Sequence, residues 1–556
     1  MASPCRSFWS MGRWTAVAGA VAAAMALAAG ELAAAITGGP SLVIAVGDLV
    51  VDLAPGWLVR RTIDLLGTSQ KPALLIGIVV VTLLAGAVLG RVATAGRRAR
   101  WLVFVGFGLV GAGAASGSER PLSGLVAGIL AAVVGVAVLE VALRKVPVSG
   151  PQVGDPLVGP PADVPFQDPR VKASTRRGFM VYAAGMSVAA GVVAVGSRVL
   201  ATRGSEELRE QVVLPPGRRT VGERPTTTTS TTTTTPTTPT TSTTTTSPTT
   251  TAAEGPWTPM PGLTTWITPN DDFYRIDTAL VVPRVDPTTW VMSIEGFVER
   301  PLRFTLDDLL GMDLVDSAVT LNCVSNEVGG GLVGNAVWTG VPLAQLLAEA
   351  GLEPGAQQVM AWSVDGFNAG FPVATALDGR TALVAVGMNG EPLPFRHGFP
   401  ARLVVGGLYG YVSAVKWLDR IQLTSLDDDG YWMPRGWAKH GPIKIASRID
   451  VPTGSRAPTG LQPVAGVAWA PVAGVAAVEV SVDDGPWTQC RILQDSAAGQ
   501  PGESWVQWLH TWDAEPGVRV LRVRAHDLDG RVQPPGPKSI APDGAEGYHA
   551  RRILVA

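Results

Sequence analysis

One cysteine in the second half of the chain has the surroundings of a functional residue. Cys323 ends the apolar run Thr320-Leu321-Asn322 and precedes a glycine-rich stretch at 329–331. A thiolate is a soft metal ligand, but a lone cysteine is most often a small buried hydrophobe. From position alone, both interpretations of Cys323 are open.

A second group of polar residues follows further along the chain. It comprises His397, Arg402, Ser413 and Lys416. Arginine binds a phosphate through two parallel N–H donors, and lysine binds it as a point charge. The group is therefore suited to a phosphate, with a surface charge cluster as the alternative.

The elements that would position these residues are short strands and helices. Apolar patterning predicts strands at 290–296 and at 402–405, and a short helix at 343–350. From about 443 onward, runs such as 475–482 and 519–526 alternate and end in Asp-Gly turns. This part of the chain is typical of an Ig-like β-sandwich.

In this order, several motifs resemble the sulfite oxidase family of molybdopterin-dependent oxidoreductases, over about residues 260 to 556. The motifs are Pro269-Asn-Asp-Asp-Phe-Tyr-Arg275, Leu321-Asn-Cys323, Trp338-Thr-Gly-Val-Pro-Leu343, His397-Gly-Phe-Pro-Ala-Arg402 and Val415-Lys-Trp417. The resemblance implies an α+β molybdopterin domain, followed by the Ig-like dimerisation domain of the family.

The resemblance also implies a cofactor and the residues that hold it. The cofactor is a molybdopterin whose dithiolene binds molybdenum, with Cys323 as a third sulfur ligand and catalytic residue. The pterin phosphate is then held by His397, Arg402, Ser413 and Lys416. Further pterin contacts are implied for Asn270, Tyr274, Arg275 and Ser363.

Two acidic residues bear on the substrate. Sulfite oxidases place arginines four and five residues after the cysteine, whereas this chain has Glu327 and Val328 there. A carboxylate near the metal would repel sulfite, so a neutral sulfoxide or another neutral oxo-acceptor is at least as plausible a substrate. Asp365 is a candidate proton donor, with a turn or helix cap as the alternative role.

The first half of the chain has the composition of a membrane protein. Charged residues make up only 16% of the chain, and hydrophobic residues 46%. We expect five spans, each near the ~20 residues that a bilayer requires, at about 15–36, 73–92, 101–118, 122–143 and 179–201. The segment 42–59 is also apolar but contains Asp48, Asp52 and Pro55, which favours an interfacial or re-entrant segment over a span.

Basic residues in the short loops predict the orientation of this membrane region. Placing them inside puts the chain after residue 201 outside, so we expect a multi-pass cell-membrane protein with an extracytoplasmic catalytic domain. The segment Ser174–Met180 contains Arg176-Arg177 and resembles a twin-arginine export signal, with ordinary positive flanking as the alternative. Export after folding would suit a domain that takes up a large cofactor in the cytoplasm.

A low-complexity segment separates the two halves. Residues 226 to 251 contain only threonine, serine and proline, which bury nothing and favour an extended stalk. The predicted organisation is a transmembrane region at 1–201, a flexible linker at 202–256, a catalytic domain at 257–442 and an Ig-like domain at 443–556.

These observations predict a membrane-anchored molybdenum oxidoreductase that transfers an oxygen atom to or from a small substrate. The formal net charge of −2 gives no basic surface, so we expect no nucleic-acid partner.

All five histidines lie at or after position 397, which excludes a bis-histidine haem in the membrane region. Electrons would then come from a separate redox protein or from quinone, with Glu31 and Glu140 as candidates in the second case. Other predicted partners are membrane lipid and a second copy in a homodimer. The alternatives are a non-catalytic surface binding or sensor module, and a transporter with a regulatory domain.

Overall fold

The computed structural model describes residues 5–146 with short gaps, 176–219, 260–493 and 502–556. The chain forms two compact units, and each is described by itself. The first unit comprises residues 1–207 together with 279–284, and the second comprises the remainder of the chain.

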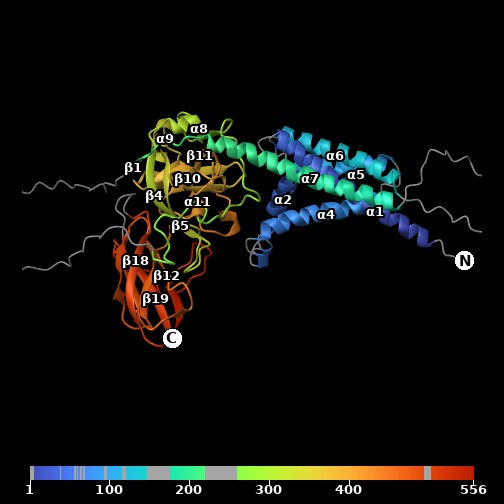
Figure 1. The fold of residues 1–556 in the computed structure, drawn as a ribbon. Coiled ribbons are helices and arrows are strands. Elements are labelled where there is room, and N and C mark those ends of the chain that lie inside the picture. The colour runs from blue at the N-terminus through green and yellow to red at the C-terminus, as the bar shows by residue number, and fades with distance from the viewer. Residues whose placement is uncertain are drawn as a thin grey trace, which may run out of the picture. The chain divides into compact units, whose positions relative to one another are not determined.

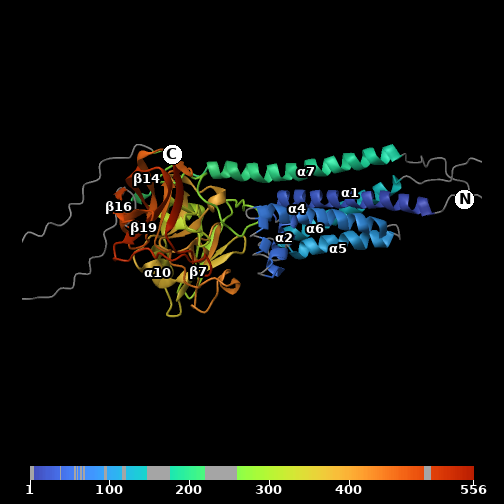
Figure 2. The same ribbon diagram turned by 90° about the horizontal axis from the view of Figure 1, so that it is seen from below.

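The first unit is helical (Figures 1 and 2). Its helices are α1 (Cys5–Thr37), α2 (Leu42–Leu53), α4 (Gln70–Val92), α5 (Arg97–Ala114), α6 (Pro121–Arg144) and the larger part of α7 (Arg176–Glu210). Close packing depends on glycine: a methyl group on Gly19 of α1 would collide with the backbone of Gly86 and Gly90 of α4. Small residues at such crossings are typical of helices that pack within a membrane.

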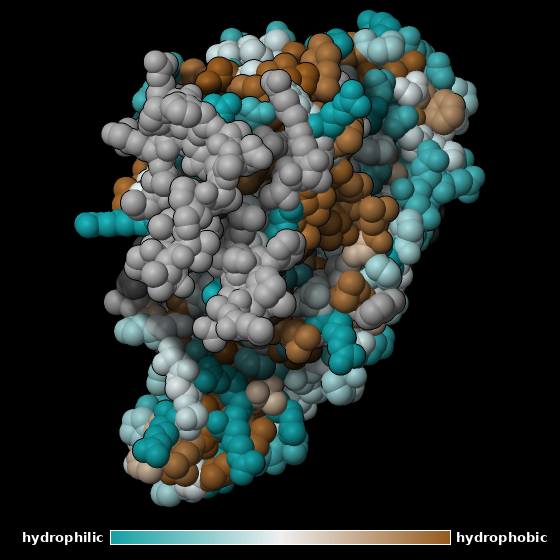
Figure 3. Space-filling model, turned by 90° about the vertical axis from the view of Figure 1, so that its right-hand side faces the viewer, coloured by the Kyte–Doolittle hydropathy of each residue, from teal (hydrophilic) through white to brown (hydrophobic). Residues whose placement is uncertain are grey.

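Four of these helices are long and apolar enough to cross a bilayer: Gly12–Thr37, Gln70–Val92, Leu122–Arg144 and Arg176–Val199. Large side chains such as Ile76, Val81 and Leu84 are exposed along α4, and apolar patches are visible on the surface in Figure 3. The third expected span falls on α5, whose apolar stretch, Phe104–Ala114 among the described residues, is shorter than a span needs.

The second unit contains two sheets that carry the candidate site residues. One has the strand order β1-β4-β5-β8-β10, with β9 beside β8; the other has the order β3-β2-β11-β6-β7. The first sheet comprises β1 (Arg218–Arg219), β4 (Val315–Asn322), β5 (Val333–Pro342), β8 (Ala382–Met388), β9 (Glu391–Pro392) and β10 (Arg402–Val405). The second comprises β2 (Val291–Gly296), β3 (Leu302–Thr305), β6 (Gln358–Ser363), β7 (Asn368–Pro372) and β11 (Leu418–Thr424). The strands expected at 290–296 and 402–405 are β2 and β10.

Short helices connect these strands: α8 (Leu306–Leu310), α9 (Leu343–Ala350), α10 (Val373–Leu377) and α11 (Gly410–Ser413). Helix α9 has the bounds that its pattern predicts. Its buried side chains are Leu343, Leu346, Leu347 and Ala350. They lie three to four residues apart, so one face of the helix packs on the core.

The C-terminal part of the second unit is β-rich. Two sheets have the orders β12-β14-β18-β17 and β13-β20-β19-β15-β16, and side chains of both form one buried core. Their longer strands are β12 (Ala446–Val451), β14 (Gly460–Trp469), β15 (Val475–Val482), β18 (Val506–Ala514), β19 (Gly517–Asp527) and β20 (His549–Val555). The short strands are β13 (Arg456–Ala457), β16 (Thr488–Gln489) and β17 (Arg491–Leu493). The predicted strand at 475–482 is β15, and the one at 519–526 lies within β19.

The structure differs from the expected flexible linker at 202–256 over the first residues of that range. Residues up to Glu210 continue α7, and Arg218–Arg219 form β1, which pairs in parallel with β4. The threonine-rich run lies outside the described residues, as do Ser174 and Thr175 of the twin-arginine motif, whereas Arg176 is the first residue of α7.

Candidate active site

Cys323 follows the last residue of β4 and is held by its backbone. Its N–H donates to the carbonyl of Leu332 at 2.9 Å, and its carbonyl accepts from the N–H of Asn326 at 3.0 Å. The Asn326 side chain closes the same loop by accepting from the Leu332 N–H at 2.8 Å. The loop after the strand therefore fixes Cys323, which is 9% exposed, at a cavity wall.

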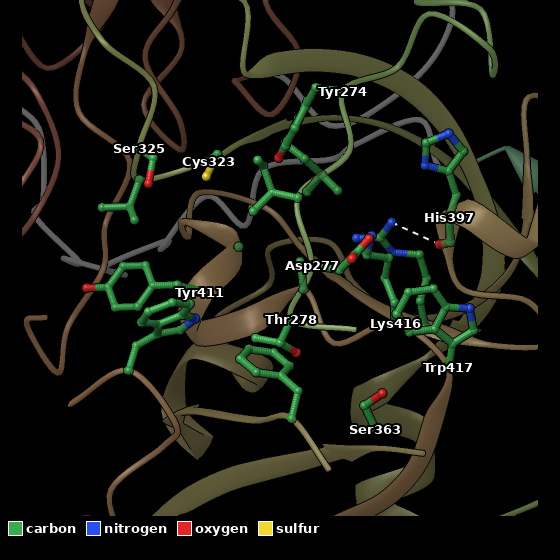
Figure 4. Close-up of a pocket in the computed structure, with 18 of the residues that line it drawn as sticks. Tyr274, Asp277, Thr278, Cys323, Ser325, Ser363, His397, Tyr411, Lys416 and Trp417 are labelled. Carbon is green, nitrogen blue, oxygen red and sulfur yellow. Dashed lines mark hydrogen bonds and ion pairs between the residues drawn. The ribbon is translucent and has the colours of Figure 1, made fainter. Parts of the chain in front are cut away.

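The structure brings seven of the ten predicted site residues to one cavity (Figure 4). They are Tyr274, Cys323, Ser363, Asp365, His397, Arg402 and Lys416. They come from six separate segments of the chain, so the cavity is a product of the whole domain fold. Cys323, Ser325 and Tyr411 lie on one side of the view, and His397 and Lys416 on the other.

The other three predicted residues do not line this cavity. The carbonyl of Asn270 lies 2.8 Å from Nε2 of His397, so Asn270 positions that ring. Arg275 pairs with Asp277 at 2.9 Å and is partly exposed. Ser413 is fully buried and donates to the carbonyl of Tyr409 at 3.1 Å, which is a structural contact within its own turn.

Arg402 is a buried cation at the basic side of the cavity. It is 4% exposed, donates to the His397 carbonyl at 3.1 Å, and lies 4.8 Å from the ring centre of Trp338. Burial lowers its pKa to about 10, so it stays charged at neutral pH. Within the described part of the chain, Arg402 forms no ion pair with a carboxylate, and it faces the cavity with its charge uncompensated.

Lys416 lies beside Arg402 and is held by a residue that sequence reasoning missed. Its Nζ is 2.9 Å from Oδ2 of Asp277, whose side chain is only 4% exposed. Burial lowers the pKa of Lys416 to about 8, and the carboxylate of Asp277 opposes that shift. The only sequence signal for Asp277 was its place two residues after the Pro269–Arg275 motif.

His397 is neutral in this environment. Burial lowers its pKa to about 3, the hydrogen bond to Asn270 opposes the shift, and the charges of Arg402 and Lys416 lower the pKa further. Because the Asn270 carbonyl is only an acceptor, Nε2 carries the proton and Nδ1 is an acceptor.

The residues on this side fit a phosphate group. An unpaired buried guanidinium is unfavourable unless an anion compensates its charge. Arg402 and Lys416 supply charged donors at one wall, and only Lys416 has a carboxylate partner. The cavity therefore suits a ligand with an anionic group at this wall and a metal-binding group near Cys323.

Cys323 itself is not an activated nucleophile. Burial raises the pKa of its thiol, while hydrogen bonds with Ser325 and the charge of Lys416 oppose that shift. A buried thiol of this kind becomes a thiolate when a metal ion coordinates it. The chemistry of the site therefore favours the ligand role for Cys323 over free nucleophilic catalysis.

The Cys323 side of the cavity is aromatic. Ser325 and Tyr411 lie on this side in Figure 4. The Tyr411 ring lies 5.8 Å from the ring of Trp437, which lies 6.3 Å from the ring of Trp432, and all three residues line the cavity. Sequence reasoning missed both tryptophans, although Tyr431-Trp432 and Trp437 form a local concentration of aromatic residues.

The two acidic residues lie in different places. Glu327 is exposed and lines a separate hollow with Val328, so it does not face the Cys323 cavity. Asp365 lines the cavity, accepts from the Phe367 N–H at 3.2 Å and accepts from the Thr278 hydroxyl at 3.1 Å. These contacts are those of a turn-stabilising carboxylate.

Comparison with known proteins agrees with this geometry. Residues 279–432 match the oxidoreductase molybdopterin binding domain. This fold and site define a molybdopterin-binding oxidoreductase domain, and molybdenum cofactor is its cofactor.

Several characterised molybdenum enzymes are similar to this chain. Mouse (Mus musculus) mitochondrial sulfite oxidase is 31% identical over 324 residues, which cover 50% of this chain and 59% of the mouse protein. Chicken (Gallus gallus) sulfite oxidase is 28% identical, with 50% and 69% covered. A rice (Oryza sativa subsp. japonica) nitrate reductase [NADH] is 32% identical over 178 residues, covering 27% and 19%. The chain is thus similar to sulfite oxidases over about half of its length, and it spans less than two thirds of the mammalian relatives.

One solved structure is similar to part of this chain. The sulfane dehydrogenase SoxCD of Paracoccus pantotrophus is 26% identical, with a TM-score of 0.45, and covers 53% of this chain and 84% of its own.

Proposed function

We propose that the protein transfers an oxygen atom to or from a small neutral substrate, outside the cytoplasm and anchored to the membrane. The observation that carries the proposal is the arrangement of Cys323 opposite the uncompensated charge of Arg402 in one cavity. When bound, molybdenum cofactor supplies two-electron oxygen-atom transfer.

The residues of this chain have distinct roles in that reaction. Arg402 and Lys416 bind the anionic end of the cofactor, and neutral His397 offers Nδ1 as an acceptor. Cys323 anchors the metal. Burial raises the pKa of Tyr274, so its hydroxyl remains a neutral hydrogen-bond donor beside the cavity. The tryptophans and Tyr411 exclude water from the Cys323 side.

The aromatic wall supports a neutral substrate such as a sulfoxide over sulfite. The basic residues that line the cavity in the described structure are His397, Arg402 and Lys416. His397 and Lys416 lie on the side opposite Tyr411 (Figure 4), and Arg402 donates to the carbonyl of His397. An anionic substrate would therefore approach Cys323 along aromatic and apolar side chains, where its desolvation is not compensated. Since Glu327 lies elsewhere, the preference rests on these side chains and not on repulsion by that carboxylate.

Membrane anchoring and the extracytoplasmic location are supported by the four long apolar helices and by the basic loops. The side chain of Glu31 accepts from the Ser41 hydroxyl at 2.7 Å, where it supports the start of α2. This contact favours a structural role for Glu31, and a separate redox protein as the electron partner. The two packed sheets at 446–555 support an Ig-like dimerisation domain.

The test is turnover by the purified full-length protein from a host that makes molybdopterin. With a reduced viologen dye as electron donor, we expect loss of a neutral sulfoxide together with oxidation of two dye molecules per sulfoxide. With sulfite and a chemical oxidant, we expect a higher KM. Preferential oxidation of sulfite would contradict the neutral-substrate proposal, and no turnover of either substrate by metal-loaded protein would contradict the oxygen-transfer proposal.

A further inference from the structure

Residues 208–219, called here the clip, join the end of α7 to the edge of the first sheet of the second unit. Arg209 lies at its start: the Nε of Arg209 donates to the carbonyl of Leu393 at 3.0 Å, and its guanidinium donates to the carbonyl of Pro392 at 3.2 Å. The Arg209 side chain is only 14% exposed. The end of the helix is thus bound to the hairpin of β8 and β9.

The middle of the clip packs on β8. A methyl group on Gly387 would collide with the side chain of Leu214, so these two residues are in close contact. The preceding residue, Val213, is 81% exposed. Adjacent residues therefore differ in whether they touch the domain.

The end of the clip adds a strand to the sheet. Arg218 and Arg219 pair in parallel with Val315 and Asp316 of β4, and the Arg218 N–H donates to the Leu314 carbonyl at 2.8 Å. A side chain at Gly217 would collide with Asp316, so only glycine permits this close approach. Main-chain pairing at a sheet edge is a recognised way to attach a peptide segment.

The chain returns to the same sheet after the threonine-rich run. The Thr268 N–H donates to the carbonyl of Asn335 in β5 at 2.8 Å, and the Asn335 side chain donates to the Trp266 carbonyl at 2.9 Å. Both flanks of the run at 226–251 are therefore bound to neighbouring strands, β4 and β5. Because the residues on both flanks of the run bind the same sheet, the length of the run does not determine how the catalytic domain is attached to α7.

We propose that the clip, and not the threonine-rich run, attaches the catalytic domain to α7. The stalk expected from the sequence then carries no mechanical load. Cleavage within the run should then leave the two fragments together.

The test uses the full-length chain in detergent, with an affinity tag at the N-terminus and a specific protease site inserted between Thr240 and Thr241. After complete cleavage, the tagged N-terminal fragment is captured, and the C-terminal fragment that co-purifies is quantified. We expect the C-terminal fragment to remain bound. Its release from the otherwise unmodified chain would overturn the proposal.

Matched variants assign the attachment to the clip. Residues 279–284 of the C-terminal fragment belong to the first unit as well, so the clip is one of two attachments. We expect Leu214→Asp combined with Arg209→Ala to lower the co-purified fraction after cleavage, whereas Val213→Asp leaves it unchanged. Equal retention of all variants would also overturn the proposal. The molybdenum content and the thermal midpoint of the C-terminal fragment show whether each variant is folded. If the Leu214→Asp and Arg209→Ala double variant is misfolded, Gly217→Leu takes its place as the variant that disrupts the clip. None of these readouts depends on which substrate the enzyme uses.

Discussion

The two sides of the cavity differ in charge, and the difference separates the binding of the cofactor from the choice of substrate. At one side, Arg402 and Lys416 are buried cations, of which only Lys416 pairs with a carboxylate. Ser325 and Tyr411 lie on the other side with Cys323 (Figure 4), the Trp437 ring contacts Tyr411, and the Trp432 ring contacts Trp437. A buried charge is favourable when a bound ligand compensates it, and aromatic side chains favour contact with a neutral group.

The largest effect is expected at Cys323. Replacing it with serine keeps the size of the side chain but removes the soft metal ligand, so the fold persists and turnover falls. We expect a loss of activity larger than the roughly 10- to 100-fold that removal of a supporting residue at a metal site produces. Steady-state rates and circular dichroism of Cys323→Ser measure the two effects, and undiminished activity would refute the ligand role.

A change at the basic side should act on cofactor retention. Arg402→Gln removes a charged donor and is expected to weaken retention by roughly 10- to 100-fold, the range for a charge-assisted hydrogen bond. Pterin released on dilution, measured by fluorescence, reports the change. Arg420→Gln is the matched control, because Arg420 is half-buried, pairs with Glu295 at 3.1 Å and does not line the cavity. If both variants release pterin equally, the charge of Arg402 has no specific role.

A change at the aromatic side should act on the substrate instead. We expect Trp437→Ala to raise the KM for a neutral sulfoxide by roughly 10-fold, since removal of apolar contacts from a pocket has effects of this size. Molybdenum and pterin contents should be unchanged. A fall in cofactor content with an unaltered KM would reverse the assignment of the two sides.

The smallest expected effect is on stability and concerns Glu503, a buried carboxylate outside the cavity. Its pKa is raised by burial, whereas burial lowers the pKa of the cations in the cavity. Glu503 is 1% exposed and accepts the N–H of Thr381, and burial raises its pKa to about 7. The folded state therefore holds a proton that the unfolded chain loses near pH 4.5. Stability from this group is complete below about pH 4.5 and is lost as the pH rises to about 7.

Glu503→Gln should remove this dependence. Its thermal midpoint is expected to equal that of the parent at about pH 4.5 and to exceed it by a few degrees at about pH 8, where the parent must bury a charge. Differential scanning calorimetry at both pH values measures the difference. An identical pH dependence in the two proteins would show that folding does not shift the pKa of Glu503.

Much of the local structure and part of the site follow from sequence patterns. The helix at 343–350 and the strands at 402–405 and 475–482 have the predicted bounds, because their burial patterns are regular and local. His397 and Arg402, which one motif pointed to, line the same cavity as Cys323. Such residues are predictable because each lies within a short segment whose chemistry is distinctive.

The remaining features depend on contacts between distant segments. Asp277 reaches Lys416 across 139 positions of the chain, and no local pattern indicates that pair. Trp432 and Trp437, in the loop after β11, line the same cavity as Cys323 although they are more than 100 positions away in the chain. Strand β1 has two residues, too few for any alternation, so its position before the threonine-rich run favoured a linker.

The most direct test of the account is the coordination of molybdenum in the full-length protein. X-ray absorption at the molybdenum edge counts sulfur ligands, and it should be measured on the parent and on Cys323→Ser, each with its pterin content determined. The account predicts three sulfur ligands in the parent and two in the variant. An equal number of sulfur ligands in both proteins would show that Cys323 does not bind the metal.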